Sequence, residues 1–98
     1  MEIEKVKDGK KLDVKIVGRI DTKTAPELSE MLKDELDGVE ELTLDLSEVV
    51  YISSAGLRVI LSAQKRMTKQ GSMKVTNVQD IVMEVFESTG FVDILTIE

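Results

Sequence analysis

The sequence predicts an α/β fold with a mixed, mainly parallel sheet and helices mostly on one face. Strand and helix patterns alternate along the 98 residues in the order β-β-α-β-α-β-α-β. Strand–helix–strand units with short links place their strands parallel, with right-handed crossovers. Two strands alternate apolar and polar residues, whereas a parallel sheet covered on both faces reads as continuous apolar runs. One face of the sheet is therefore expected to be partly wet, and residues 1–98 are expected to form one domain.

The chain opens with a predicted β-hairpin. Residues 2–6 and 11–17 read as strands and flank Asp8-Gly9, a dipeptide typical of hairpin turns. The second of these strands alternates apolar and charged residues. This hairpin adds an antiparallel edge to the sheet.

A first helix is predicted within residues 18–38. Thr24 and Glu27 have the spacing of a capping box, and Pro26 suits a first turn. Gly38 suits the position just after the helix. The predicted apolar face consists of Ala25, Leu28, Leu32 and Leu36, with Met31 beside them.

Residues 41–49 form the clearest strand, because leucine alternates with polar residues there. A second helix is predicted from about Ser54 to Gln70, with Gly71 as its stop. Its predicted apolar face consists of Leu57, Ile60, Leu61 and Gln64.

Residues 73–77 predict a short strand. Asn77 can cap a third helix that ends at Gly90. The predicted apolar face of this helix consists of Val78, Ile81, Val82, Val85 and Phe86. Residues 91–97, FVDILTI, predict a last strand.

The junction YISSAGLRVIL, residues 51–61, carries two adjacent serines. A catalytic serine needs a base, usually histidine, and the chain has no histidine. The G-x-S-x-G elbow and the P-loop string are missing, and without Cys or His a zinc site is excluded in practice. We therefore predict no enzymatic activity, no catalytic residue, no metal and no cofactor.

Capping explains only one of the two serines. Ser53 has the position of an N-cap, which leaves the hydroxyl of Ser54 free at the mouth of the sheet. Gly56 in the first turn costs up to about 1 kcal/mol against alanine, so the bare backbone suggests close approach by another group. The carboxyl end of a central strand is also where open α/β sheets bind ligands.

The net charge of −6 limits the possible partners. An acidic surface repels phosphate backbones and anionic membranes, so neither nucleic acid nor a membrane is an expected partner. A basic protein surface is a better match. No run of 18 apolar residues, no signal sequence and no cysteine occur, so we expect a cytoplasmic location.

Two stretches carry a resemblance to a known family. Residues 45–61, DLSEVVYISSAGLRVIL, resemble the central signature of STAS domains, specifically of bacterial anti-sigma-factor antagonists. Residues 18–28, GRIDTKTAPEL, resemble the second signature of that family. The two motifs have matching separation, and the resemblance covers essentially the whole chain, including the order of strands and helices.

The resemblance implies a phosphorylation site. In that family an anti-sigma factor, itself a serine kinase, phosphorylates the serine two positions before a Gly-Leu step, which here is Ser54. Ser53 stands where aspartate is usual and offers a second hydroxyl, so it is an alternative acceptor. Asp21 matches an acidic position that contacts the kinase, although a helix cap is an equally good reading. The implied partner-binding residues are Asp21, Ser53, Ser54, Ala55, Gly56 and Arg58.

The resemblance implies a monomeric anti-sigma-factor antagonist. The unphosphorylated form would bind the kinase and release the sigma factor, and a PP2C-type phosphatase would restore it after phosphorylation. One alternative is a STAS interaction module of another signalling or transporter-associated complex, with a vestigial serine. Another is a small nucleotide- or acyl-phosphate-handling enzyme, but no motif gathers the three arginines into a cationic site.

Overall fold

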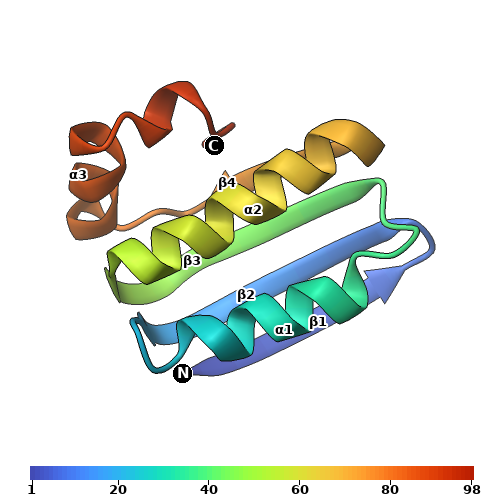
Figure 1. Cartoon of the computed structure of the whole chain (residues 1–98), viewed down its shortest axis with the longest axis horizontal. Coiled ribbons are helices and arrows are strands. Elements are labelled where there is room, and N and C mark those ends of the chain that lie inside the picture. The colour runs from blue at the N-terminus through green and yellow to red at the C-terminus, as the bar shows by residue number, and fades with distance from the viewer.

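The computed structural model describes all 98 residues as a four-stranded sheet that carries helices on one face (Figure 1). The strands lie in the spatial order β1 (Glu2–Asp8), β2 (Lys11–Ile20), β3 (Glu41–Ile52) and β4 (Ser72–Thr76). The helices are α1 (Ala25–Glu35), α2 (Ser54–Gln70) and α3 (Asp80–Ser88). β1 pairs antiparallel with β2, and the other neighbours pair parallel, which confirms the predicted α/β fold.

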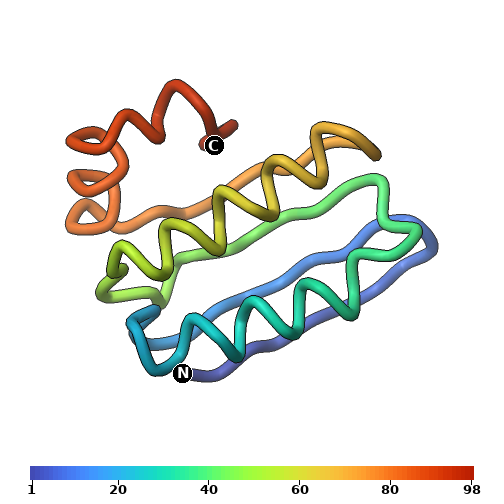
Figure 2. Tube along the Cα trace, viewed as in Figure 1, coloured from blue at the N-terminus to red at the C-terminus, as the bar shows by residue number.

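The two sheet faces differ as the alternation predicted. Leu42, Leu44 and Leu46 of β3 are buried under the helices, whereas Thr43 and Asp45 point to the other face and line a shallow hollow there. α1 and α2 lie side by side and run in the same direction (Figure 2). Both helices therefore begin at the carboxyl ends of the strands that precede them.

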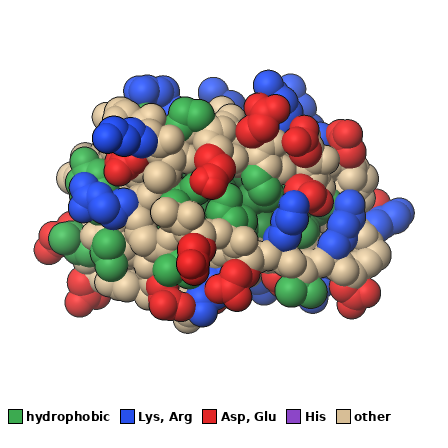
Figure 3. Space-filling model, turned by 90° about the horizontal axis from the view of Figure 1, so that it is seen from below, with side chains coloured by type: hydrophobic (Ala, Val, Ile, Leu, Met, Phe, Trp, Pro, Cys, Tyr) green, Lys and Arg blue, Asp and Glu red, His purple; other side chains and the backbone are tan.

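The core is almost entirely aliphatic. Of its 22 clustered residues Phe86 is the one aromatic, and no polar or charged residue is buried. Seen from the β1 side, charged side chains of both signs surround a small apolar area (Figure 3). None of the three helices has the length and hydrophobicity needed to cross a membrane.

The start of α1 differs from the prediction. The side chain of Thr24 does not cap α1, so the predicted capping box is wrong. The Thr24 hydroxyl instead donates to the carbonyl oxygen of Arg19 at 2.8 Å, because the loop folds back on the end of β2. The helix ends at Glu35, and Gly38 follows in the left-handed region with φ of +78°.

α2 has the predicted bounds, but its buried stripe is shifted. Ala63 and Met67 are buried, whereas Leu61 and Gln64, which were expected on the apolar face, are only half-buried. The buried residues of α2 are those that face the sheet. Leu61 and Gln64 lie to one side of them and line a hollow beside Ile94. The stop at Gly71 is required by close approach, since a Cβ there would lie 1.9 Å from the carbonyl oxygen of Glu40.

The cap predicted for the third helix is wrong. α3 begins after Gln79, while Asn77 adopts φ of +55° and donates from its side-chain amide to Asp45 at 3.4 Å. Within α3, Val82 and Phe86 are buried, but Ile81 is 56% exposed and lies off the core face.

The predicted last strand is also largely wrong. Residues Phe91–Asp93 form a short 3-10 helix, and only Ile97 makes a bridge to β4, through Val75. The Phe91 ring stacks on Phe86 with centroids 6.2 Å apart, and this contact requires a compact turn after Gly90 rather than an extended chain. The final residues still hydrogen-bond to β4, so they cover its outer edge.

The first turn of α2 packs so closely on the sheet that only glycine fits. A Cβ on Gly56 would lie 2.7 Å from Cγ2 of Ile20 and 2.9 Å from Cγ1 of Ile52. We expect Gly56→Ala to lower the free energy of unfolding by about 1–3 kcal/mol, because overpacking outweighs the better helix propensity of alanine. Urea denaturation measures this change. The control is Ser54→Ala at an exposed position of the same turn, expected within about 0.5 kcal/mol of wild type. Wild-type stability of Gly56→Ala would contradict the overpacking argument.

Candidate functional site

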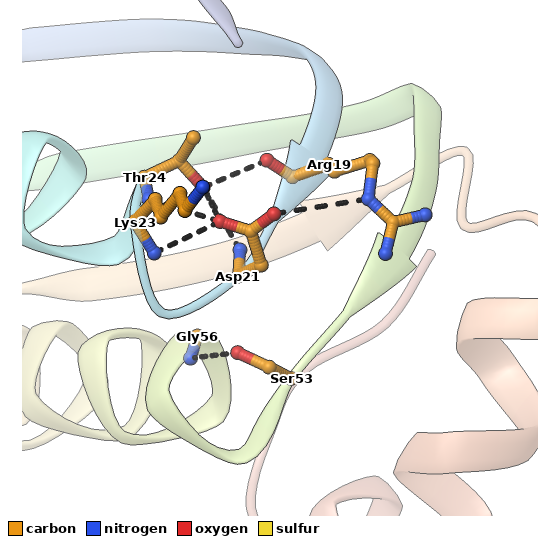
Figure 4. Close-up of polar contacts among 6 residues, drawn as sticks. All are labelled: Arg19, Asp21, Lys23, Thr24, Ser53 and Gly56. Atoms are coloured by element: carbon orange, nitrogen blue, oxygen red, sulfur yellow. Dashed lines mark hydrogen bonds and ion pairs between the residues drawn. The ribbon is translucent and has the colours of Figure 1, made fainter.

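The carboxyl end of β3 leads directly into α2, with Ser53 as the capping residue. Ser53 has an extended backbone, and its Oγ accepts a hydrogen bond from the backbone N–H of Gly56 at 3.2 Å (Figure 4). Its carbonyl oxygen accepts from the N–H of Leu57 at 2.9 Å. The predicted N-cap is confirmed, and the Ser53 hydroxyl is already engaged within the fold.

Ser54 is the first residue of α2 and is exposed. Its hydroxyl makes no hydrogen bond within the chain, in contrast to that of Ser53. The first turn of α2 contains no acidic residue, and the free N–H groups of a helix N-terminus favour negative charge. The position is therefore accessible and electrostatically suited to carry an anionic group.

Gly56 and Ala55, in the first turn of α2, differ in what surrounds them. Gly56 is buried, and the close approach that it permits is to Ile20 and Ile52 of its own chain. The close approach that the sequence suggested at this glycine is therefore the packing of α2 on the sheet. Ala55 is half-buried and lines a hollow between α1 and α2.

Asp21 directly follows β2 and lies beside the start of α2. The ends of β2 and β3 are adjacent there, because Ile20 pairs with Ile52 and the carbonyl oxygen of Ile20 accepts a hydrogen bond from the N–H of Ser53 at 2.8 Å. The Oδ1 of Asp21 accepts hydrogen bonds from the backbone N–H groups of Lys23 at 3.0 Å and Thr24 at 3.1 Å. Asp21 thus caps the turn that leads into α1, in line with one of the two roles expected for it.

These contacts shift the titration of Asp21. The hydrogen bond from the backbone N–H of Thr24 has the largest effect and lowers the pKa of Asp21 below the usual carboxyl value. The hydrogen bond from the N–H of Lys23 lowers this pKa further, whereas partial desolvation raises it. Nε of Arg19, 3.7 Å from Oδ2, favours the ionised form as well. The site therefore presents a fixed carboxylate at neutral pH.

Arg19 and Tyr51 form a feature that the sequence patterns did not indicate. The Arg19 guanidinium carbon lies 4.2 Å from the centroid of the Tyr51 ring, a cation–π contact. The two residues are neighbours because their Cα atoms are paired between β2 and β3. That pairing follows irregularities in the β2–β3 register, so alternation alone could not have predicted it.

Arg58 lies one turn after Ser54 on α2 and is exposed. Its guanidinium makes no hydrogen bond or ion pair within the chain, whereas Arg19 and Arg66 each pair with an aspartate. The structure thus brings all six implied partner-binding residues to one end of the sheet. No group of three or more acidic side chains there, or elsewhere, is close enough to hold a metal ion.

Asp45 and Ser47 of the central motif have a structural role. Burial raises the pKa of Asp45, but the hydrogen bonds from Ser47 and from the Asn77 amide outweigh it and lower the pKa below its usual value. The backbone N–H of Ser47 lies 2.9 Å from Oδ1 of Asp45. These contacts tie β3 to the loop after β4.

The lowered pKa of Asp21 predicts a pH-dependent contribution to stability. Asp21→Asn should lower the free energy of unfolding above the usual aspartate pKa of about 3.9, where the folded-state carboxylate is fully ionised. The difference from wild type should vanish as the pH falls through the lowered pKa, because Asp21 is then protonated. Urea denaturation between pH 2 and 7, in about one-unit steps, measures it. Asp34→Asn on α1 controls for the loss of charge alone, and a difference independent of pH would contradict the assignment.

Comparisons with known proteins fit this geometry. The STAS domain family model matches residues 2–98. The anti-sigma-B factor antagonist of Bacillus subtilis (strain 168) is 36% identical over 87 residues, covering 88% of this chain and 80% of that protein. The protein of the same name from Listeria monocytogenes is 36% identical over 98 residues, covering 96% of this chain and 84% of that protein.

Solved structures show the same fold. The anti-sigma factor antagonist SpoIIAA in its unphosphorylated form superposes with a TM-score of 0.85 at 12% identity, covering 99% of this chain and 88% of that chain. SpoIIAA in its phosphorylated form gives a TM-score of 0.77 at 11% identity, covering 99% and 91%. The chain therefore belongs to the STAS domain family.

Proposed function

We propose that the chain is an anti-sigma-factor antagonist that is switched off by phosphorylation at Ser54. Unphosphorylated, it binds an anti-sigma factor that is also a serine kinase, and the sigma factor is released. The observation that carries this proposal is the exposed, unbonded hydroxyl of Ser54 at the start of α2, in a chain whose relatives are named anti-sigma-B factor antagonists.

The choice between the two serines rests on their hydrogen bonds. The Ser53 hydroxyl accepts a hydrogen bond from Gly56, and the residue is half-buried, so its phosphorylation would require the cap of α2 to rearrange. Ser54 can accept a phosphoryl group without the loss of any hydrogen bond within the chain. The geometry therefore favours Ser54 as the acceptor.

A phosphate on Ser54 should be tolerated by the fold. It carries a charge of about −1.5 to −2 near pH 7, and a helix N-terminus favours negative charge by about 0.3–1 kcal/mol. The fold match to SpoIIAA in both of its forms supports this tolerance. The switch must then act at the interface with the kinase.

At that interface the phosphate has to lose water. Desolvating a charged group that lacks a partner costs several kcal/mol. A nearly complete population switch needs about 5.5 kcal/mol of differential affinity, which is of the same order. In the proposed cycle a PP2C-type phosphatase removes the phosphate and restores binding.

The chain acts in this cycle as a substrate and a binding module. It has no histidine or cysteine, and no base lies in hydrogen-bond contact with the Ser54 hydroxyl. We therefore propose that it has no enzymatic activity of its own. The cycle takes place in the cytoplasm, where RNA polymerase and its sigma factors act.

The edge strand β1 supports a monomer. Lys5 and Lys7 lie on the helix face of β1, because they pair with Val14 and Leu12, whose side chains are in the core. Glu2 and Glu4 lie on the open face. If β1 paired antiparallel with β1 of a second chain around a two-fold axis, side chains of the same face would lie opposite each other. Lysines would then oppose lysines, or acidic residues would oppose acidic residues. The mixed charges seen from this side fit an edge protected against pairing (Figure 3).

The central prediction concerns phosphorylated Ser54. Phosphorylation by the anti-sigma kinase should leave the melting temperature within a few degrees of wild type. The affinity for the kinase should fall at least about tenfold, which corresponds to about 1.4 kcal/mol. Calorimetry on the phosphorylated and unphosphorylated chains measures both quantities.

Two variants test the assignment of the acceptor. Ser54→Ala should bind the kinase but resist inactivation. Ser53→Ala should lose about 1 kcal/mol of stability through the lost cap, yet still be phosphorylated. Phosphopeptide mapping that finds the phosphate on Ser53 would reverse the assignment. A chain that no kinase of the source organism binds or phosphorylates would favour a STAS module of another complex.

The edge argument predicts the oligomeric state. Sedimentation equilibrium should give the mass of one chain, because every two-fold pairing of β1 brings like charges together. A stable dimer whose hydrogen-exchange protection lies on β1 would show that this charge pattern does not protect the edge.

A further inference from the structure

A continuous groove separates α1 from α2 on the helix-covered face. Two adjoining hollows of about 260 and 460 Å³ share Ser29, Val59 and Ser62 in their linings, so they form one groove. It starts at Pro26 in the first turn of α1 and reaches Arg66 near the end of α2. α1 has 11 residues, so the groove runs beside roughly 16 Å of helix, about three turns.

The groove has an apolar floor and short walls. Leu32, Leu36 and Ala63 lie at its base and are buried. Ser29 and Ser62 face it from the two helices and are exposed. Because no long side chain fills this middle section, the backbone of a visiting helix could approach closely.

The charges along the groove have one sign. Three charged residues line it, Lys33, Arg58 and Arg66, and all are basic, although the chain has 19 acidic against 13 basic residues. Arg58 has no ion-pair partner, whereas Arg66 is held by Asp37 at 2.6 Å. The N-terminus of α2, whose first turn has no acidic residue, opens at one end of the groove and adds positive potential. An otherwise acidic protein thus presents a basic-rimmed apolar channel.

We propose that this groove binds an amphipathic helix whose apolar face is flanked by Asp and Glu, supplied by the protein that recognises Ser54. The inference rests on the proposed function, because it extends the footprint of that partner. Ala55, the residue after Ser54, lines the groove, and so does Arg58 one turn later. A helix that lays its apolar face into a groove between two helices is a common mode of peptide recognition. The basic rim selects an acidic helix through charge complementarity.

The absence of cysteine allows a direct block of the groove. The affinity of Ser62→Cys for the anti-sigma kinase of the source organism is measured first without a label, and this value is the reference for the labelled form. After reaction with pyrene maleimide, its affinity should fall at least about tenfold. Lys65→Cys, labelled in the same way, is the control, because Lys65 lies on the other side of α2 beside Ile94. Isothermal titration calorimetry measures both variants before and after labelling.

A charge pair tests the acidic nature of the helix. Lys33 and Lys69 are exposed lysines in the last turns of α1 and α2, but only Lys33 lines the groove. Lys33→Glu should weaken binding at least about threefold, the size expected of an exposed ion pair. Lys69→Glu makes the same charge change at the same position of a helix, its last turn, as Lys33→Glu does. This variant should bind like wild type.

The outcomes separate this inference from the proposed function. If the labelled Ser62→Cys variant binds like the labelled control while Ser54→Asp weakens binding, the groove is not used and the Ser54 switch stands. If Lys33→Glu and Lys69→Glu behave alike, the occupant is not acidic and the proposal is overturned. If the wild-type chain self-associates and the label on Ser62→Cys abolishes this, the occupant is a second copy and the proposal is again overturned. If the kinase does not bind the wild-type chain at all, the proposed function fails and this inference with it.

Discussion

The parallel pairing of Ile20 with Ile52 is the contact on which the candidate site depends. It aligns the ends of β2 and β3, so that the loop carrying Asp21 and the turn carrying Ser53 are held together by a backbone hydrogen bond of 2.8 Å. The first turn of α2 packs directly on the side chains of both isoleucines. Gly56 lets the helix approach them, and this approach sets where the Ser54 hydroxyl emerges. The stability of the fold and the proposed recognition of Ser54 therefore depend on the same few contacts.

In the proposed switch, the two serines have different tasks that one residue could not perform together. A capping hydroxyl must stay in contact with an N–H group of its helix, whereas an acceptor hydroxyl must be free to react. Ser53 holds the cap and Ser54 is free. In the family signature that this sequence resembles, an aspartate usually stands at the position of Ser53. The serine caps α2 without adding a negative charge beside Ser54.

Local periodicity predicted most of the fold, because the sheet alternation and the bounds of α2 depend on neighbouring residues. It failed where a distant contact decides. Thr24 and Asn77 have the sequence positions of helix caps. In the structure Thr24 donates a hydrogen bond to the Arg19 carbonyl, and Asn77 donates one to Asp45. Phe91 belongs to a strand pattern, yet stacking on Phe86 bends the chain. The family signatures indicated Ser54 and Asp21 as candidate site residues. The contact between Arg19 and Tyr51 depends on a strand register that no local pattern contains.

The contact between Arg19 and Tyr51 also gives the molecule a built-in optical reporter. Tyr51 is the only tyrosine of the chain, and there is no tryptophan. The residue is 39% exposed, and its ring lies beneath the Arg19 guanidinium at the end of β3, two residues before Ser53. All tyrosine emission of the unlabelled protein therefore comes from this one place. Any event that moves Arg19 or covers the ring changes that emission, so the state of the site can be followed without an added dye.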